Sequence, residues 1–142
     1  MTAQPEEQLL RVRQWMEKAD HDLQNAEHTL TLHDDDCPFD TVCFHAQQCA
    51  EKYLKGWLVY RNVDFPRTHD LVVLARQAEG AGLRGTSLGD VQPLNRYTIE
   101  ARYPGDWEPI ERPEAEQAVT LARRLRAAVR ALFSPGVLPG KE

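Results

Sequence analysis

The sequence predicts an all-α protein, built as an up-and-down bundle of four to five helices in a single domain. Apolar residues recur at steps of three and four along most of the 142 residues, and this is the spacing of one face of an α-helix. No segment alternates apolar and polar residues over a useful length, so strands are not expected. Proline- and glycine-rich segments separate the periodic stretches and are typical of turns.

The first helix is expected from residue 5 to about residue 32. Its apolar positions are Val12, Trp15, Ala19, Leu23, Ala26 and Leu30. This seven-residue repeat suits antiparallel packing. The acidic segment 33–40 then interrupts the helix. Its aspartates favour the N-terminus of the next helix, and Pro38 suits the first turn of that helix. The aspartates also suggest a cation site, although solvated helix caps are the commoner use of such a run.

The helix expected over Thr41–Tyr60 has two different faces. Its apolar line consists of Val42, Ala46, Cys49, Tyr53 and Trp57, with Cys43, Ala50 and Leu54 beside it. Its polar line consists of His45, Gln48, Lys52 and Lys55. The apolar line faces a core, whereas the polar line is either a solvated or dimer-facing surface or a binding site. Glu51 and Lys55 lie four residues apart and can form an ion pair along the helix. Gln47 and Gln48 need hydrogen-bonding partners if they face the interior.

The second half of the chain is expected to hold two or three further helices. Thr68 caps a helix over residues 68–82, with Asp70 in its first turn. Ser87 and Asp90 form a capping-box pattern that begins a helix over residues 87–103. Pro93 is expected to bend or delay that helix.

The last helix is expected from Pro113 to about residue 132, after a loop over residues 103–113. Its apolar positions are Ala115, Ala118, Ala122, Leu125, Val129 and Leu132. The domain core is therefore expected to span about residues 8–133, and residues 134–142 are expected to form a loose tail.

Composition narrows the class of protein. Hydrophobic residues make up 42% and charged residues 27% of the chain, as in ordinary globular domains. No apolar run is long enough to span a membrane, the N-terminus lacks a secretory pattern, and the three cysteines are expected to be small, reduced core residues. These features favour a cytoplasmic protein. The net charge of −5 argues against nonspecific nucleic-acid binding but allows a local anion or nucleotide site.

Three blocks of sequence stand in a distinctive order. They are FHAQQCAEKYLKGWL at residues 44–58, FPRTHDL at 65–71 and EARYPG at 100–105. Together they resemble the HEPN family (higher eukaryotes and prokaryotes nucleotide-binding) over about residues 8–133. The resemblance implies a prokaryotic helical bundle that forms a homodimer. It also implies a minimal nucleotidyltransferase as a partner, in a two-component, toxin–antitoxin-like module.

Many HEPN proteins are also metal-independent ribonucleases, so the resemblance raises the question of catalysis. Their active site has an arginine and a histidine separated by four to six residues. In this chain seven residues separate Arg61 from His69, and seven separate Arg13 from His21. Since neither spacing matches, the sequence favours a binding protein over an enzyme.

The candidate site collects polar residues from the three blocks. They are His45, Gln48, Lys52, Lys55, His69, Asp70, Arg102 and Tyr103. Lysine and arginine bind phosphate, a tyrosine ring can stack on a base, and glutamine can hydrogen-bond the edge of a base. Backbone N–H groups at the helix start near His69 can hold an anion. No metal or cofactor is expected, because the sequence has neither paired cysteines nor a glycine-rich phosphate loop.

Three functions remain open at this point. The first is a HEPN homodimer that binds a nucleotide, RNA or a nucleotidyltransferase. The second is a ribonuclease toxin with an atypical site built from His45, His69 and Arg102, since histidine titrates near neutral pH. The third is a purely structural helical dimer, in which the polar residues only cap helices and pair with neighbouring charges.

Overall fold

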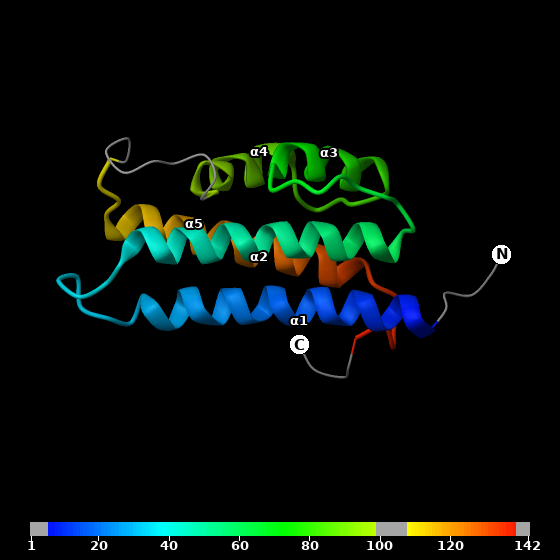
Figure 1. Cartoon of the computed structure of the whole chain (residues 1–142), viewed down its shortest axis with the longest axis horizontal. Coiled ribbons are helices and arrows are strands. Elements are labelled where there is room, and N and C mark those ends of the chain that lie inside the picture. The colour runs from blue at the N-terminus through cyan, green and yellow to red at the C-terminus, as the bar shows by residue number, and fades with distance from the viewer. Residues whose placement is uncertain (1–5, 99–107, 139–142) are drawn as a thin grey trace.

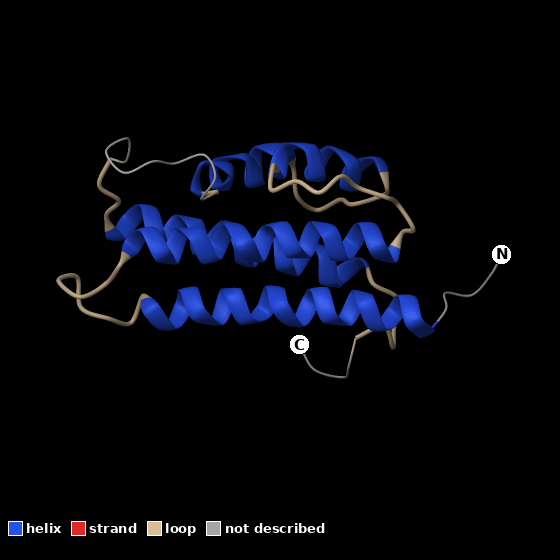
Figure 2. Cartoon of the chain, in the orientation of Figure 1, coloured by secondary structure: helices blue, strands red, loops and turns tan. Residues whose placement is uncertain are grey.

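The computed structural model describes residues 6–98 and 108–138. Within these ranges every regular element is helical (Figures 1 and 2). In chain order the elements are α1 (Glu6–Thr29), α2 (Phe39–Tyr60), α3 (Leu71–Gly80), α4 (Leu88–Val91), the 3₁₀-helix η1 (Gln92–Tyr97) and α5 (Arg112–Leu132). The predicted all-α bundle is confirmed.

The long helices do not simply alternate in direction. Helices α1 and α2 form an antiparallel pair, whereas α5 runs in the same direction as α2 (Figure 1). The start of α5 lies beside the end of α1, because Arg112 donates hydrogen bonds to the carbonyls of Leu30 and Leu32. The far ends of α2 and α5 also meet, since the Tyr60 and Phe133 rings lie 4.8 Å apart. The segment that contains α3, α4 and η1 connects α2 to α5. It returns the chain to the end of the bundle at which α2 began, and α5 starts there (Figure 1).

Helix α2 is the central element, with α1 on one side and the α3–α4 layer on the other (Figure 1). Its predicted apolar line is confirmed, because Val42, Ala46 and Cys49 have no exposed surface. Helix α1 packs closely here, since a Cβ atom at Gly56 would lie only 1.9 Å from Cε of Met16. The central position explains why α2 carries more buried residues than any other helix that the structure describes.

The buried stripe of α1 differs from its prediction at two positions. Leu30, which was expected at its end, is only partly buried and lies beyond Thr29, the last residue of α1. Met16 is 2% exposed, whereas Trp15, which was expected in the stripe, is only half-buried. The observed stripe steps by four and three residues, from Val12 through Met16 to Ala19, which follows the 3.6-residue turn closely. Trp15 therefore lies at the edge of the core, where its ring contacts Phe65 edge-on.

The predicted helix over residues 87–103 is wrong as a continuous element. The capping box is confirmed, since Asp90 accepts a hydrogen bond from the Ser87 N–H at 3.0 Å. However, α4 ends after four residues and η1 follows. Pro93 has no N–H group and cannot continue the α-helical ladder, which accounts for the change. Residues 99–103 of the predicted helix lie outside the described ranges.

Residues 134–138 are packed against α1, although a loose tail was predicted from residue 134. Arg13 donates from Nε to the carbonyl of Val137 at 2.6 Å and from a terminal nitrogen to the carbonyl of Gly136 at 3.1 Å. Val137 is 6% exposed. A guanidinium group can bind two successive carbonyls, and this local docking left no periodic pattern in the sequence.

The cysteines behave as predicted. Cys37, Cys43 and Cys49 are all buried, and none forms a disulfide. Burial raises the pKa of the Cys49 thiol far above its ordinary value, with the nearby Asp20 carboxylate adding to the effect. These thiols are therefore core residues. Among the described helices, none is both long and apolar enough to cross a membrane.

Candidate functional site

The polar line of α2 divides into two clusters, each built around a carboxylate. The first is centred on Asp22 of α1, which stands opposite two α2 side chains. His45 Nδ1 lies 2.9 Å from one oxygen of Asp22, and Lys52 donates to the other oxygen at 2.5 Å. His45 and Lys52 are seven residues apart, so they lie two turns apart on the same side of α2. Their side chains are 23% and 25% exposed, so both reach the surface beside α1.

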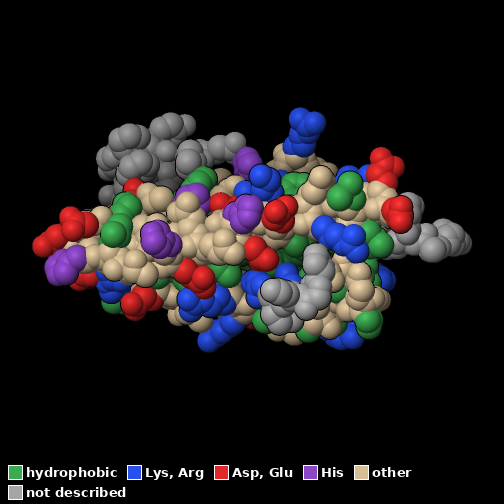
Figure 3. Space-filling model, turned by 90° about the horizontal axis from the view of Figure 1, so that it is seen from below, with side chains coloured by type: hydrophobic (Ala, Val, Ile, Leu, Met, Phe, Trp, Pro, Cys, Tyr) green, Lys and Arg blue, Asp and Glu red, His purple; other side chains and the backbone are tan. Residues whose placement is uncertain are grey.

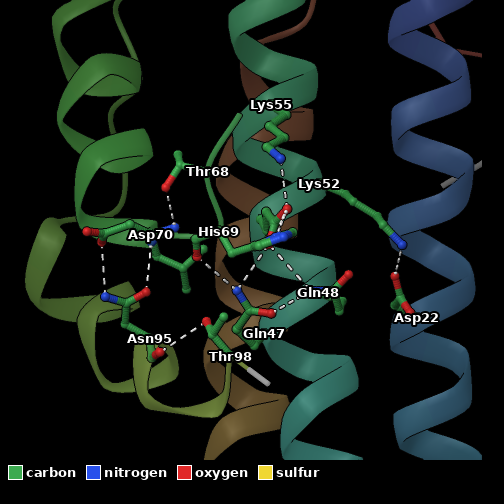
Figure 4. A network of polar contacts seen from close by, with 12 residues as sticks. Asp22, Gln47, Gln48, Lys52, Lys55, Thr68, His69, Asp70, Asn95 and Thr98 are labelled. Carbon is green, nitrogen blue, oxygen red and sulfur yellow. Dashed lines mark hydrogen bonds and ion pairs between the residues drawn. The ribbon is translucent and has the colours of Figure 1, made fainter. Parts of the chain in front are cut away.

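The second cluster is centred on Glu51, whose side chain is 5% exposed (Figure 4). Lys55 donates to Glu51 at 2.8 Å, and His69 Nδ1 lies 3.0 Å from each carboxylate oxygen. Gln47 donates to the same carboxylate at 3.2 Å and to the carbonyl of His69 at 3.3 Å. Gln48 in turn donates to Gln47 at 2.8 Å. The partners that the two amides were predicted to need are thus Glu51 and the backbone before α3.

The Glu51 carboxylate is held in its charged form. Burial by itself raises the pKa of this group, but hydrogen bonds from Lys55 and His69 outweigh the effect of burial. The net result is a pKa below the ordinary value of 4.5. Glu51 is therefore an anion at neutral pH, and it orients His69 through Nδ1.

Lys55 is not part of the exposed surface on which it was predicted. The residue is 8% exposed, and its ammonium group lies 5.7 Å from the centre of the Trp15 ring and 5.9 Å from that of Phe65. The predicted pairing with Glu51 is confirmed. Because the ammonium group lies near both rings and Glu51 neutralises its charge, Lys55 stabilises the interior.

The start of α3 is not the open anion site that was predicted. Asp70, and not Thr68, is the N-cap residue, and its side chain accepts from Val72 N–H at 2.9 Å. Thr68 Oγ1 accepts from Asp70 N–H at 3.0 Å, and Asn95 Oδ1 accepts from Leu71 N–H at 2.9 Å. Side-chain oxygens already satisfy these N–H groups, and the charge of Asp70 repels an anion. Asn95, in η1, was not predicted from the sequence.

Four of the predicted side chains are partly exposed, and we call them the polar strip: His45, Gln48, Lys52 and His69. Asp70 is exposed as well, but it caps α3. Gln48 lies on α2 between His69 on one side and the Lys52–Asp22 pair on the other (Figure 4). The His69 side chain is 43% exposed. Histidine side chains gather on the face seen from the α1 side, among acidic and basic neighbours (Figure 3). The structure thus brings together half of the eight predicted site residues.

The polar strip contains two carboxylate–histidine pairs, Asp22 with His45 and Glu51 with His69. A carboxylate beside Nδ1 favours the tautomer with the proton on that nitrogen and fixes the plane of the ring. Such an imidazole can exchange a proton through Nε2 or hydrogen-bond an anion there. Arg102 and Tyr103, which were predicted to complete the site, lie outside the described residues.

A third polar network, which the sequence did not predict, joins α1, α2 and α5. Tyr53 belongs to the apolar line of α2, yet its hydroxyl donates to Asp20. Arg126 donates to the same carboxylate at 2.9 Å, and Arg130 lies 3.6 Å from it. Burial and the bond to Asp20 raise the pKa of Tyr53 far above its ordinary value. The hydroxyl is therefore neutral, and it donates a hydrogen bond from the core to the partly exposed carboxylate of Asp20.

The acidic segment between α1 and α2 shows no cation site. Within residues 6–98 and 108–138, no group of three or more His, Cys, Asp or Glu side chains is placed to hold a metal ion. Asp34 of this segment instead pairs with Arg112 at 2.5 Å, and Asp35 lies 3.9 Å from His33. These contacts favour the alternative of a solvated helix connection.

The helical bundle is that of a HEPN domain. The HEPN domain model matches residues 12–132, and the chain belongs to this family. It is similar to TT1696 from Thermus thermophilus, with 30% identity and a TM-score of 0.72, over 87% of this chain and 98% of that one. It also shares its fold with ST0689, an archaeal HEPN homologue, with 23% identity and a TM-score of 0.64, over 84% and 95% of the two chains. No protein of curated function matches the chain.

Proposed function

We propose that this HEPN-domain protein binds a nucleotide or a phosphate group of RNA at the polar strip. The observation that supports the proposal is the pair of carboxylate-held histidines. His45 stands beside Lys52 at Asp22, and His69 is held by Glu51. Gln48 lies between His69 and Lys52 (Figure 4). Ring nitrogens, an amide and an ammonium group at one surface can hydrogen-bond phosphate and the edge of a base.

Charge balance determines how such a ligand binds. Lys52 is matched by Asp22, and Lys55 is matched by Glu51, so the strip is nearly neutral when both imidazoles are neutral. A phosphate bound there competes with Asp22 for the Lys52 ammonium group and can accept a hydrogen bond from the Gln48 amide.

The test is the melting temperature of the purified chain with ATP or a short RNA oligonucleotide. A ligand at a hundred times its Kd stabilises the fold by about 2.7 kcal/mol, which is readily measured. Lys52→Ala is expected to remove the rise, whereas Arg124→Ala, on the exposed face of α5, is expected to keep it. If neither ATP nor RNA raises the melting temperature of the wild type, the binding proposal is wrong.

A ribonuclease activity independent of metal is the second candidate, and one observation favours it. Two histidines held through Nδ1 by carboxylates can act as a general base and a general acid. The proposal ranks second because no arginine has the HEPN spacing to a histidine. The test is RNA degradation in the presence of a chelator. His69→Ala is expected to abolish it, and intact RNA with the wild type would exclude this function.

We also propose that the chain acts as a homodimer and with a minimal nucleotidyltransferase, as half of a toxin–antitoxin-like module. Membership of the HEPN family supports this proposal, since such pairing is common there. Light scattering on the full chain is expected to give twice the mass of 16.2 kDa. Co-purification with a nucleotidyltransferase encoded beside the gene tests the second partner, and separate elution of the two proteins would count against it.

A further inference from the structure

An open cavity of about 390 Å³ lies between α1 and α5. It is lined by Asp20, Leu23, Gln24, Glu27, Arg123 and Arg126. Asp20 and Asp22 are two residues apart on α1, so their side chains leave the helix about 200° apart. Since Asp22 pairs with His45 and Lys52 of the polar strip, the cavity lies at the opposite edge of α1. It is a separate place on the molecule, and the proposed function does not use it.

Helix α5 supplies a row of guanidinium groups to this cavity. Arg123, Arg126 and Arg130 follow one another at steps of three and four, which places them on one face of the helix. Arg126 and Arg130 share the carboxylate of Asp20, at 2.9 and 3.6 Å, and Arg123 pairs with Glu27 at 2.6 Å. Of these three, Arg123 and Arg126 line the cavity, together with the two carboxylates that pair with them.

The two sides of the cluster differ in how firmly they are held. Arg123 and Glu27 are 57% and 36% exposed, and an ion pair this exposed contributes little to stability. Arg126 and Asp20 are 25% and 24% exposed, and the hydroxyl of the buried Tyr53 also donates to that carboxylate. An incoming anion can therefore displace Glu27 from Arg123, while Asp20 keeps Arg126 in place.

We propose that this cavity binds a small molecule that carries a phosphate group. Arg123 and Arg126 present planar donor forks, which match the geometry of phosphate oxygens. Leu23, which is 6% exposed, supplies an apolar floor, and the amide of Gln24 can hydrogen-bond the uncharged part of the ligand. The volume lies in the range of about 300–1,000 Å³ that is usual for small-molecule sites, and a mononucleotide is of suitable size.

Calorimetric titration of the full chain with AMP tests the proposal. Arg123→Gln is expected to weaken binding at the cavity at least tenfold, because it removes one of two phosphate donors. Glu27→Gln is expected to tighten binding several-fold, because it removes the carboxylate that competes for Arg123. Arg124→Gln is the matched control, since this exposed neighbour points about 100° away around α5, and it is expected to leave binding unchanged.

The same titration separates this site from the polar strip. A loss of AMP binding in Arg123→Gln but not in Lys52→Ala supports the cavity. The proposal is overturned if AMP does not bind at millimolar concentration, if Glu27→Gln weakens binding, or if Arg124→Gln is as damaging as Arg123→Gln. Loss in Lys52→Ala alone would overturn the cavity proposal and leave the proposed function standing.

Discussion

Replacing Glu51 by glutamine tests whether the buried cluster holds the segment before α3 against α2. Glutamine keeps the shape of the side chain but removes its charge. The Lys55 ammonium group, which lies 2.8 Å from Glu51, then stays in the interior without its anion. His69 loses the carboxylate that lies 3.0 Å from its Nδ1 atom. Both effects destabilise the folded state, because an uncompensated charge is costly away from water.

The expected magnitude follows from the burial of the pair, whose side chains are 5% and 10% exposed. Removing one partner of a buried ion pair costs about 3–5 kcal/mol. For a domain of this size each kcal/mol lowers the melting temperature by about 3–4 °C, so Glu51→Gln is expected to lower it by about 10–20 °C. Glu51→Gln with Lys55→Met removes both charges and is expected to recover most of the loss.

The dependence on pH gives a second readout of the same pair. The folded-state pKa of Glu51 lies below its ordinary value of 4.5. The stability that this difference supplies is therefore fully present above about pH 4.5 and is lost as the pH falls toward the folded-state pKa. Glu51→Gln cannot titrate, so its stability is expected to decline less steeply than that of the wild type over this acid range.

The assay is unfolding by denaturant, followed by circular dichroism at neutral and acid pH. Glu17→Gln, at an exposed position of α1, is the control, and it is expected to change stability by less than about 0.5 kcal/mol. The reasoning is refuted if Glu51→Gln costs less than about 1 kcal/mol at neutral pH, or if the double variant is less stable than the single one.

Further stability predictions concern the helix start, the core hydroxyl and the close approach of α1. Asp70→Ala removes the N-cap of α3 and is expected to cost about 1 kcal/mol, and no loss in thermal unfolding would contradict the cap. Tyr53→Phe leaves Asp20 without its buried donor and is expected to cost about 1–3 kcal/mol by the same assay; an unchanged melting temperature would count against it. Gly56→Val places Cβ within 1.9 Å of Met16 Cε and is expected to cost about 2 kcal/mol or more in denaturant unfolding, and equal stability would show that the helices can separate.

The long helices were predictable because their apolar patterns run over five or more turns. Helices α2 and α5 begin and end within about two residues of their predicted limits. The short elements α4 and η1 were not predictable, because their conformation depends on contacts with residues distant in sequence. Leu94 and Tyr97 are buried in η1, and Tyr97 donates to Glu114 of α5. That contact favours a compact 3₁₀ segment here, and it cannot be predicted from local helix propensity.

The candidate site shows the same division between local and distant contacts. The pairing of Glu51 with Lys55 follows from their spacing of four residues, but the burial of Lys55 depends on Trp15 and Phe65. The contact of Glu51 with His69 joins residues 18 apart, and no rule of spacing predicts it. Contacts of this kind decide which polar residues reach the surface and which stabilise the interior.

The partners of two carboxylates, one beside the site and one at the start of α3, could not be predicted from the sequence either. Asp22 holds both His45 and Lys52, yet nothing in the apolar pattern of α1 singles it out. Asn95 lies 25 residues beyond Asp70 and bonds it at 3.0 Å. A polar residue that needs a partner is visible in a sequence, as Gln47 was, but the identity of that partner is set by packing.

The most direct measurement of ligand binding at the polar strip is the NMR spectrum of the histidine rings. The chain has five histidines, of which His45 and His69 belong to the strip, and His33 lies in the exposed segment before α2. Titration with ATP at constant pH is expected to shift the ring signals of His45 and His69 while those of His33 stay unchanged. Equal shifts at all five rings, or none at His45 and His69, would contradict the account.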